Sequence, residues 1–189
     1  MPPRITVALD IPEPTFSHRQ TSEGIPGRSD FLRRRTQELN SRLNGLTKAN
    51  LVTGHQMHVR ERHPGSGCFG VTGLEVWIRI KDFSVYVASE LAVGSCRYDV
   101  TLRHEMKHVA VFRQGAQRLQ QRWQAELDKA GLARPIPAAS AEQAHRRLSS
   151  AVQTLMNDIR QQEWQRMTRE NALLDTPSAY RAEYRQCDP

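Results

Sequence analysis

The stretch 99–112, DVTLRHEMKHVAVF, opens the first of two long helices that the sequence predicts, and it contains the pattern H-E-x-x-H. Asp99 can cap this helix. His104 and His108 are four residues apart, so their imidazoles lie on one helix face and can reach a single metal ion at ~2.0–2.1 Å. The same helix face continues with the apolar side chains of Val111, Phe112 and Leu119, so we expect this face to be buried. The spacing therefore predicts a buried helix face that binds a metal ion.

The second half of the chain is rich in Gln, Arg, Ala, Leu and Glu, which are good helix formers. It forms two segments, 99–130 and 140–173, which the stretch GLARPIP separates. Pro and Gly end helices, and Ser140 can cap the second segment. We predict a long helical hairpin, with the H-E-x-x-H pattern on its first helix.

The first half is typical of strands around one helix. Apolar residues alternate in 5–9 and in 50–61, which predicts two strands. A helix is expected from Ser29 or Asp30 to about Gly45, with Phe31, Leu32, Leu39, Leu43 and Leu46 on it. After the turn-forming HPGSG at 63–67, two alternating runs within 74–87 meet at Lys81-Asp82, which predicts a β-hairpin.

Together these elements predict an α+β fold with a small, mostly antiparallel sheet and one helix, followed by the helical hairpin. With 189 residues the chain fits one domain. We expect a single domain over 1–189, with a strand-rich part (1–95) and a part with the helical hairpin and a C-terminal segment (96–189).

The net charge of +7 raises the question of a nucleic-acid partner. Of the 27 basic residues 23 are Arg, and they are scattered between acidic residues, with Arg33-Arg34-Arg35 as the one run of three. Such a pattern favours solvated helix faces, so no specific nucleic-acid partner is expected. The apolar runs are far shorter than the roughly 20 residues of a membrane span, so no span is expected either. The oligomeric state is left open.

Glu105 lies between the two histidines in the sequence and is offset by about 100 degrees from His104 around the helix. It can touch a metal-bound water without binding the metal. A bound Zn²⁺ lowers the pKa of that water toward ~7 and polarises a carbonyl group. Glu105 can then take the proton and pass it to the leaving amine. The sequence thus predicts a zinc metallopeptidase, a hydrolase that acts on a peptide or protein, with a sheet edge as the substrate track.

On the H-E-x-x-H pattern the chain resembles the zincin metallopeptidases. More narrowly, Cys96 just before the pattern, the helical hairpin and a C-terminal segment with Asp resemble bacterial, mostly secreted Zn-dependent proteases of uncharacterised function. The resemblance covers about 70–187, and 1–50 matches only loosely. It implies a zincin-like fold, one zinc ion and a periplasmic or secreted location, although the first residues do not have the pattern of a secretory signal. In those relatives a His follows the Asp by five residues, whereas this chain has Tyr180.

The third metal ligand stays open between three acids. The metzincin type is excluded because Gln114 stands where it needs a His. The gluzincin arrangement takes a Glu from the following helix, where a hairpin centred near 135 makes Glu163 and Glu170 reachable. The aspzincin arrangement takes an Asp, with a Tyr that stabilises the oxyanion. Asp175 and Tyr180 resemble that arrangement, so Asp175 ranks first as ligand and Tyr180 as a catalytic residue.

Three cysteines, Cys68, Cys96 and Cys187, have no paired metal-ligand spacing. Cys96 is expected in a disulfide with Cys68 or with Cys187, because exported proteins favour disulfides. Two rival functions remain. A catalytically silent zincin-like module shares the metal ligands but has no turnover, and a basic helical adaptor that binds acidic protein or nucleic acid needs no metal.

Overall fold

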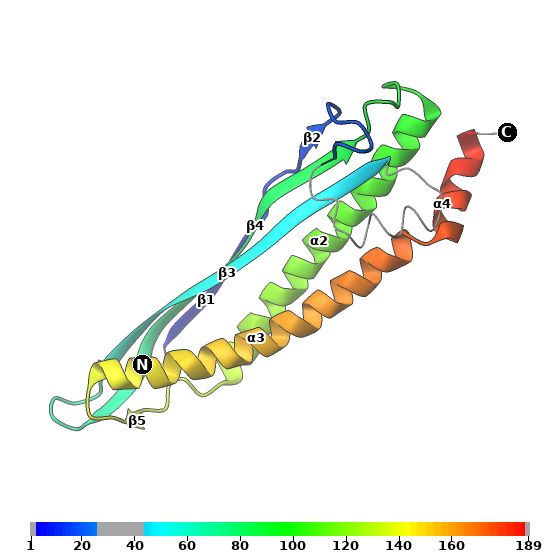
Figure 1. Ribbon diagram of the computed structural model, residues 1–189. Helices are drawn as coiled ribbons and strands as arrows, with labels where there is room; N and C mark the ends of the chain where they lie inside the picture. The colour runs from blue at the N-terminus through cyan, green and yellow to red at the C-terminus, as the bar shows by residue number, and fades with distance from the viewer. Residues whose placement is uncertain (1–2, 26–43, 188–189) are drawn as a thin grey trace. The chain divides into compact units, whose positions relative to one another are not determined.

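The computed structural model describes residues 3–25 and 44–187. The elements in chain order are β1 (Arg4–Asp10), β2 (Thr15–Ser17), β3 (Gly45–Glu61), β4 (Cys68–Val87), α2 (Cys96–Lys129), β5 (Ile136–Pro137), α3 (Ala141–Leu174), α4 (Pro177–Tyr184) and the 3-10 turn η1 (Arg185–Cys187) (Figure 1). The fold is α+β, as expected. Helices α2 and α3 correspond to the two predicted helical segments.

Strand β4 is the centre of the five-stranded sheet, because each of the other four strands pairs with it. Strand β1 lies parallel to β4, from Arg4 opposite Gly73 to Asp10 opposite Arg79, and β2 is also parallel to it. The two-residue strand β5 is antiparallel. The expectation of a mostly antiparallel sheet is therefore wrong. Parallel neighbours are joined by long connections, so their pairing leaves no local turn pattern in the sequence.

The hairpin expected at Lys81-Asp82 is also wrong, because β4 runs without a break from Cys68 to Val87. Lys81 and Asp82 are both exposed, while Ile80 and Phe83 on either side are buried. Asp82 has φ of 50°, in the left-handed region. This is the behaviour of a β-bulge, in which an extra residue shifts the alternation of faces within one strand. The break in the alternation of buried and exposed residues at Lys81-Asp82, which predicted a turn, is therefore a bulge within β4.

The helix expected between Ser29 and about Gly45 lies mostly outside the described residues. At its expected end, however, Gly45 and Leu46 are the first residues of β3 and so belong to a strand.

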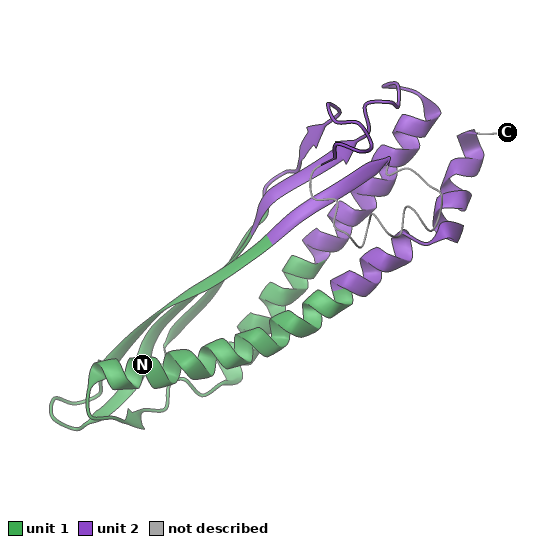
Figure 2. Cartoon of the chain, in the orientation of Figure 1, with its two compact units in different colours: residues 1–11, 51–79, 115–166 green, residues 12–50, 80–114, 167–189 purple. Residues whose placement is uncertain are grey.

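The chain divides into two compact units, which Figure 2 distinguishes by colour: unit 1 comprises 1–11, 51–79 and 115–166, and unit 2 comprises 12–50, 80–114 and 167–189. Strands β3 and β4 and helices α2 and α3 each contribute residues to both units. The expectation of a single domain stays a prediction.

In unit 1, side chains from one face of the sheet and from both long helices form a shared buried core. The side chains that are almost fully inaccessible come from β4, α2 and α3, and they include Leu74, Val76, Ile78, Leu119, Trp123, Leu127 and Val152. The indole of Trp123 donates a hydrogen bond to the carbonyl oxygen of Met156, which ties α2 to α3. Gln124 accepts from the backbone N–H of Val7, and Gln120 donates to its carbonyl oxygen, which ties α2 to β1.

Unit 2 has its own apolar core, formed by Ile80, Phe83, Val85, Val87, Ala88, Val100, Val109 and Met167, with Ile25. On α2 the buried residues continue through His104 and His108 between Val100 and Val109. The apolar spacing of the sequence therefore places both imidazoles on the inward side of the helix. Among the described residues, no helix is both long and apolar enough to cross a membrane.

Glu163 provides a test of the packing of unit 1. Its carboxylate is buried and accepts hydrogen bonds from Arg118 at 3.2 Å and Arg122 at 2.8 Å. Burial alone would raise the pKa of Glu163, but the hydrogen bonds from these two arginines hold it below its ordinary value of 4.5. We predict that Glu163→Gln lowers the free energy of unfolding at pH 7 by about 1–3 kcal/mol, the size of hydrogen bonds to a charged group.

The loss should depend on pH in one direction. Because the pKa is lower in the folded chain, the stabilisation by Glu163 is complete above about 4.5 and disappears as the pH falls through the folded value. Urea unfolding at several pH values measures this. Glu142→Gln is the matched control, since the Glu142–Arg146 pair is exposed and should change stability by at most a few tenths of a kcal/mol. Equal effects of the two substitutions would contradict the prediction.

Candidate metal centre

The first half of the candidate site comes from α2. His104 is 1% exposed and His108 8%, so both imidazoles lie inside unit 2. One turn of helix separates the two residues, and their ring centroids are 4.9 Å apart. The sequence predicts this pair from its spacing alone.

Asp175 completes the site from the turn that follows α3. Thr176 caps helix α4 by accepting from the backbone N–H of Ala179, and Pro177 occupies its first turn, so the chain changes direction just after Asp175. Asp175 Oδ1 lies 3.3 Å from His104 Nε2 and 3.1 Å from His108 Nε2. The two Nε2 atoms are 3.1 Å apart. Among the described residues, these three form the group of side chains able to hold a metal ion.

The shape of this group fits a small tetrahedral cation. A tetrahedral ion that binds N and O ligands at ~2.0–2.1 Å separates its ligand atoms by about 3.3 Å. The sides of the triangle, 3.3, 3.1 and 3.1 Å, are close to that value. His₂Asp also leaves one tetrahedral position for water or substrate, the donor count of catalytic rather than structural zinc sites.

Two further side chains fix how the imidazoles are turned. Glu183 Oε2 lies 3.0 Å from His104 Nδ1, and a carboxylate can only accept, so His104 donates from Nδ1. Asn171 donates from its amide nitrogen to the carbonyl oxygen of Met167, which leaves its Oδ1 to accept from His108 Nδ1 at 2.7 Å. In the neutral tautomers both Nε2 lone pairs therefore point at each other and at Asp175. Metal-binding histidines are oriented by such partners.

Two electron-pair donors and a carboxylate in van der Waals contact repel one another unless a positive charge lies among them. In the ion-free chain a proton supplies it. Burial lowers the pKa of His108, but the hydrogen bond with Asp175 and the charge of Glu105 outweigh burial and raise it to about 9. Burial would raise the pKa of Asp175, yet its close contacts with His104 and His108 hold it far below its usual range. This charge balance is compatible with a cation among the three donor atoms.

Glu105 lies next to this group but is held by β3. It is 3% exposed, and the hydroxyl of Thr47 lies 2.8 Å from its Oε2. Its Oε1 fills the place of a side chain at Gly45, where a Cβ would come within 2.6 Å of that oxygen. Burial raises the pKa of Glu105, against the lowering effect of the charge of His108 and the hydrogen bond from Thr47. A carboxylate with a raised pKa can both accept and return a proton near neutral pH.

Tyr180 covers the same group from α4. Its ring stacks on that of His104 with centroids 4.6 Å apart, and its hydroxyl donates to Asp175 Oδ1 over 3.1 Å. Burial and the charge of Asp175 raise the pKa of Tyr180 far above the usual value of 10. The hydroxyl therefore stays protonated and remains a hydrogen-bond donor.

The structure brings together His104, Glu105, His108, Asp175 and Tyr180, the five residues that rank first in the sequence. Of the alternative third ligands, Glu163 lies in unit 1 with its arginine partners, and neither it nor Glu170 is in the group of metal-ligating atoms.

The cysteine pairing that the sequence left open is now assigned. Cys96 forms a disulfide with Cys187, and Cys68 is free.

Four residues around the site were not predicted from the sequence to belong to it: Glu183, Asn171, Thr47 and Gly45. Glu183 follows Tyr180 by three residues and Asn171 precedes Asp175 by four, so helical spacing from these two candidate site residues could have suggested both. Thr47 and Gly45 reach Glu105 only through tertiary packing, and no local pattern indicates them.

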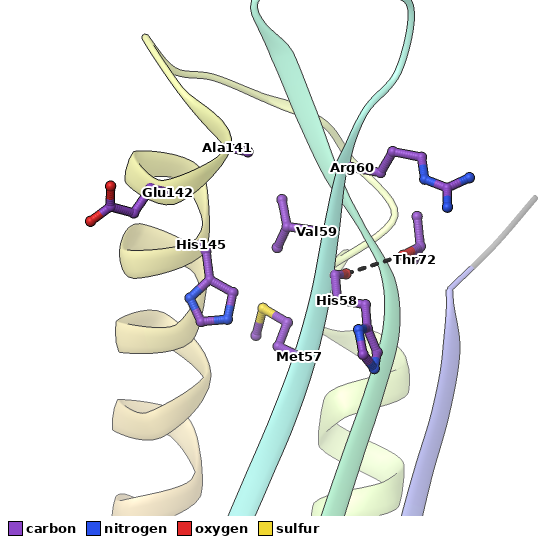
Figure 3. Close-up of a pocket in the computed structure, with 8 residues that line it drawn as sticks. All are labelled: Met57, His58, Val59, Arg60, Thr72, Ala141, Glu142 and His145. Carbon is purple, nitrogen blue, oxygen red and sulfur yellow. Dashed lines mark hydrogen bonds between the residues drawn. The ribbon is translucent and has the colours of Figure 1, made fainter.

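A separate pocket lies in unit 1, with a volume of about 420 Å³. Figure 3 shows its walls, which are residues 57–60 of β3, Thr72 of β4, and Ala141, Glu142 and His145 of α3. The hydroxyl of Thr72 donates to the carbonyl oxygen of His58 there (Figure 3). The pocket has histidines but contains no member of the His104, His108 and Asp175 group.

Comparisons of the chain with models of protein families, with curated proteins and with solved structures found no match. The resemblance to the zincins therefore stays a prediction that depends on the site residues.

Glu183 allows a test of how the imidazoles are oriented. Glu183 also pairs with Lys107 at 2.6 Å, and this hydrogen bond, with the charge of His104, lowers its pKa although partial burial would raise it. We predict that Glu183→Ala weakens Zn²⁺ binding by about 10–100-fold, the usual cost of removing a partner of a metal-binding histidine. Titration against a chelator of known affinity measures this.

Gln186→Ala is the matched control for Glu183→Ala. Gln186 lies on the same terminal segment, accepts from Arg103 of α2 and donates to the backbone carbonyl oxygen of Glu183, but it touches none of the ligands. It should bind Zn²⁺ as the unmodified chain does. Zn²⁺ binding that is unchanged in Glu183→Ala would show that Glu183 does not orient His104.

Proposed function

We propose that this protein is a zinc-dependent peptidase, with His104, His108 and Asp175 as metal ligands. The observation that carries the proposal is the triangle of donor atoms, 3.1–3.3 Å on each side, beside a buried carboxylate that is not itself a ligand. Two imidazoles and one carboxylate suit Zn²⁺, which prefers N, S and O ligands in tetrahedral geometry. Hard ions such as Mg²⁺ and Ca²⁺ favour sites with oxygen ligands only.

A bound zinc ion would polarise the scissile carbonyl group and make water a nucleophile near neutral pH. Glu105 is the general base in this proposal, since it lies next to the ligands and burial raises its pKa. Thr47 and the narrow space at Gly45 hold its carboxylate in one position. The protein thereby keeps the base oriented before substrate arrives.

Tyr180 is the proposed donor to the oxyanion. Its hydroxyl is protonated and contacts Asp175 in the free chain, so it can turn to an oxygen that develops negative charge nearby. In this proposal the substrate peptide binds along the part of β3 that belongs to unit 2. In the described part of the chain β3 pairs only with β4, and an extended peptide can add to a free strand edge. Thr47 on this strand is the link between such a peptide and Glu105.

The disulfide between Cys96 and Cys187 supports a periplasmic or secreted location, because disulfides persist in oxidising compartments. A catalytically silent module with the same ligands, and a basic adaptor without metal, are the other outcomes of the experiments below.

Metal content tests the ligand set. The chain should bind about one equivalent of Zn²⁺, and His104→Ala, His108→Ala and Asp175→Ala should each lose stoichiometric binding, because two remaining ligands hold zinc weakly. Elemental analysis after purification without chelator gives the count. Glu170→Ala is the control and should keep its zinc. If the unmodified chain takes up no zinc, the adaptor is the better description.

Glu105→Gln separates a peptidase from a silent module. The amide keeps the shape of the side chain but cannot accept a proton, so zinc should stay bound while the rate of peptide hydrolysis falls by about 10²–10⁴-fold. A peptide-library cleavage assay with both proteins measures the ratio. Zinc-loaded protein that cleaves no peptide would favour the silent module, and equal rates would place the base elsewhere.

A further inference from the structure

The residues after α3 supply a large share of the candidate site. We call 175–187 the C-terminal segment. It contains the ligand Asp175, the ring of Tyr180 that stacks on His104, and Glu183, which orients His104. Helix α2 supplies the two histidines and Glu105. The site is complete only while the C-terminal segment lies against α2.

Little apolar burial holds this segment in place. No residue of α4 or η1 is fully buried. Its contacts with α2 are mostly polar: Glu183 pairs with Lys107, the hydroxyl of Tyr184 bonds to that of Thr101, and Gln186 accepts from Arg103. The Glu183–Lys107 and Gln186–Arg103 pairs are exposed and contribute little stability each, because water competes for them, whereas the Tyr184–Thr101 bond is partly buried.

The disulfide is the covalent connection between the C-terminal segment and α2. It joins Cys187, at the end of the segment, to Cys96, the first residue of α2. Cys96 lies eight residues before His104, and Cys187 lies twelve after Asp175. Both ends of the segment are thereby fixed, one by α3 and one by the disulfide, with the metal-binding residue and its partners between them.

We propose that the Cys96–Cys187 disulfide locks the metal site, so that its reduction lowers the affinity for Zn²⁺; this rests on the proposed zinc site. The reductant is a dithiol, as in thiol–disulfide exchange. Its two thiols give two electrons and two protons, the sulfur–sulfur bond breaks, Cys96 and Cys187 become thiols, and the dithiol becomes a disulfide. Cys96 is exposed, so a reductant can reach the bond.

The physical reason is the cost of ordering the segment. With the disulfide closed, Asp175 and Glu183 are held near the histidines before metal arrives. With it open, the binding energy must also order a chain end that has few buried contacts. Linkage makes the effect reciprocal: the factor by which reduction weakens Zn²⁺ binding equals the factor by which Zn²⁺ shifts the disulfide equilibrium toward the oxidised form.

The test compares Zn²⁺ affinity in three proteins: the oxidised unmodified chain, the double variant Cys96→Ser/Cys187→Ser, and the control Cys68→Ser. Competition with a chelator of known affinity measures each dissociation constant. Serine removes the disulfide without adding thiols that bind zinc themselves. We expect the double variant to bind at least tenfold more weakly, and Cys68→Ser, which removes the free cysteine, to bind as the unmodified chain does.

Circular dichroism shows whether the double variant folds. If it does not, the same affinity is measured on unmodified protein whose Cys96–Cys187 bond has been reduced and whose thiols have then been alkylated. If the folded, disulfide-free protein binds Zn²⁺ with a dissociation constant within twofold of that of the oxidised chain, the proposal that the disulfide locks the site is wrong. Absence of Zn²⁺ binding in the oxidised unmodified chain instead overturns the proposed function, so the two failures are distinguishable.

Discussion

The approach of three electron-pair donors to within 3.1–3.3 Å of one another is the constraint on which the rest of unit 2 depends. Two imidazole nitrogens and a carboxylate oxygen repel each other in a buried place unless a proton or a metal cation lies among them. The chain nevertheless directs them together by a hydrogen bond at the far side of each ring, from His104 to Glu183 and from His108 to Asn171. Such an arrangement costs stability without a cation, which is why we interpret it as a binding site.

The two halves of this site are held by different forces. His104 and His108 are fixed by the regular geometry of α2 and by its buried apolar neighbours Val100 and Val109. Asp175 lies where α3 ends and α4 begins, a turn set by the capping residue Thr176 and by Pro177. A helix face keeps its side chains in place by itself, whereas a turn followed by a short, half-exposed helix does not. The second half therefore needs tethers, and the disulfide is the one covalent tether in the described chain.

The parts of the fold that the sequence predicted are those set by local spacing. Helical periodicity indicated α2, α3 and the inward face with both histidines, whereas Asp175 with Tyr180 was favoured by the resemblance to the aspzincin arrangement. The parallel pairing of β1 with β4 joins residues 69 apart, and no local turn announces it. At Asp82 a bulge and a turn produce the same break in alternation, so local patterns could not distinguish them. Thr47 contributes through a contact with Glu105 far away in sequence, which spacing within one helix cannot show, whereas Glu183 lies one helical turn from Tyr180.

The sheet does more than support the helices, because its strand β3 controls the carboxylate that the proposed chemistry uses. The hydroxyl of Thr47 lies within hydrogen-bond distance of Oε2 of Glu105, and the absence of a side chain at Gly45 makes room for Oε1. Burial raises the pKa of this carboxylate, while the hydrogen bond from Thr47 lowers it, so the two effects oppose each other. A carboxylate with a raised pKa suits a group that takes a proton from water and returns it to an amine. The strand that would align a peptide is thus the strand that also positions the base.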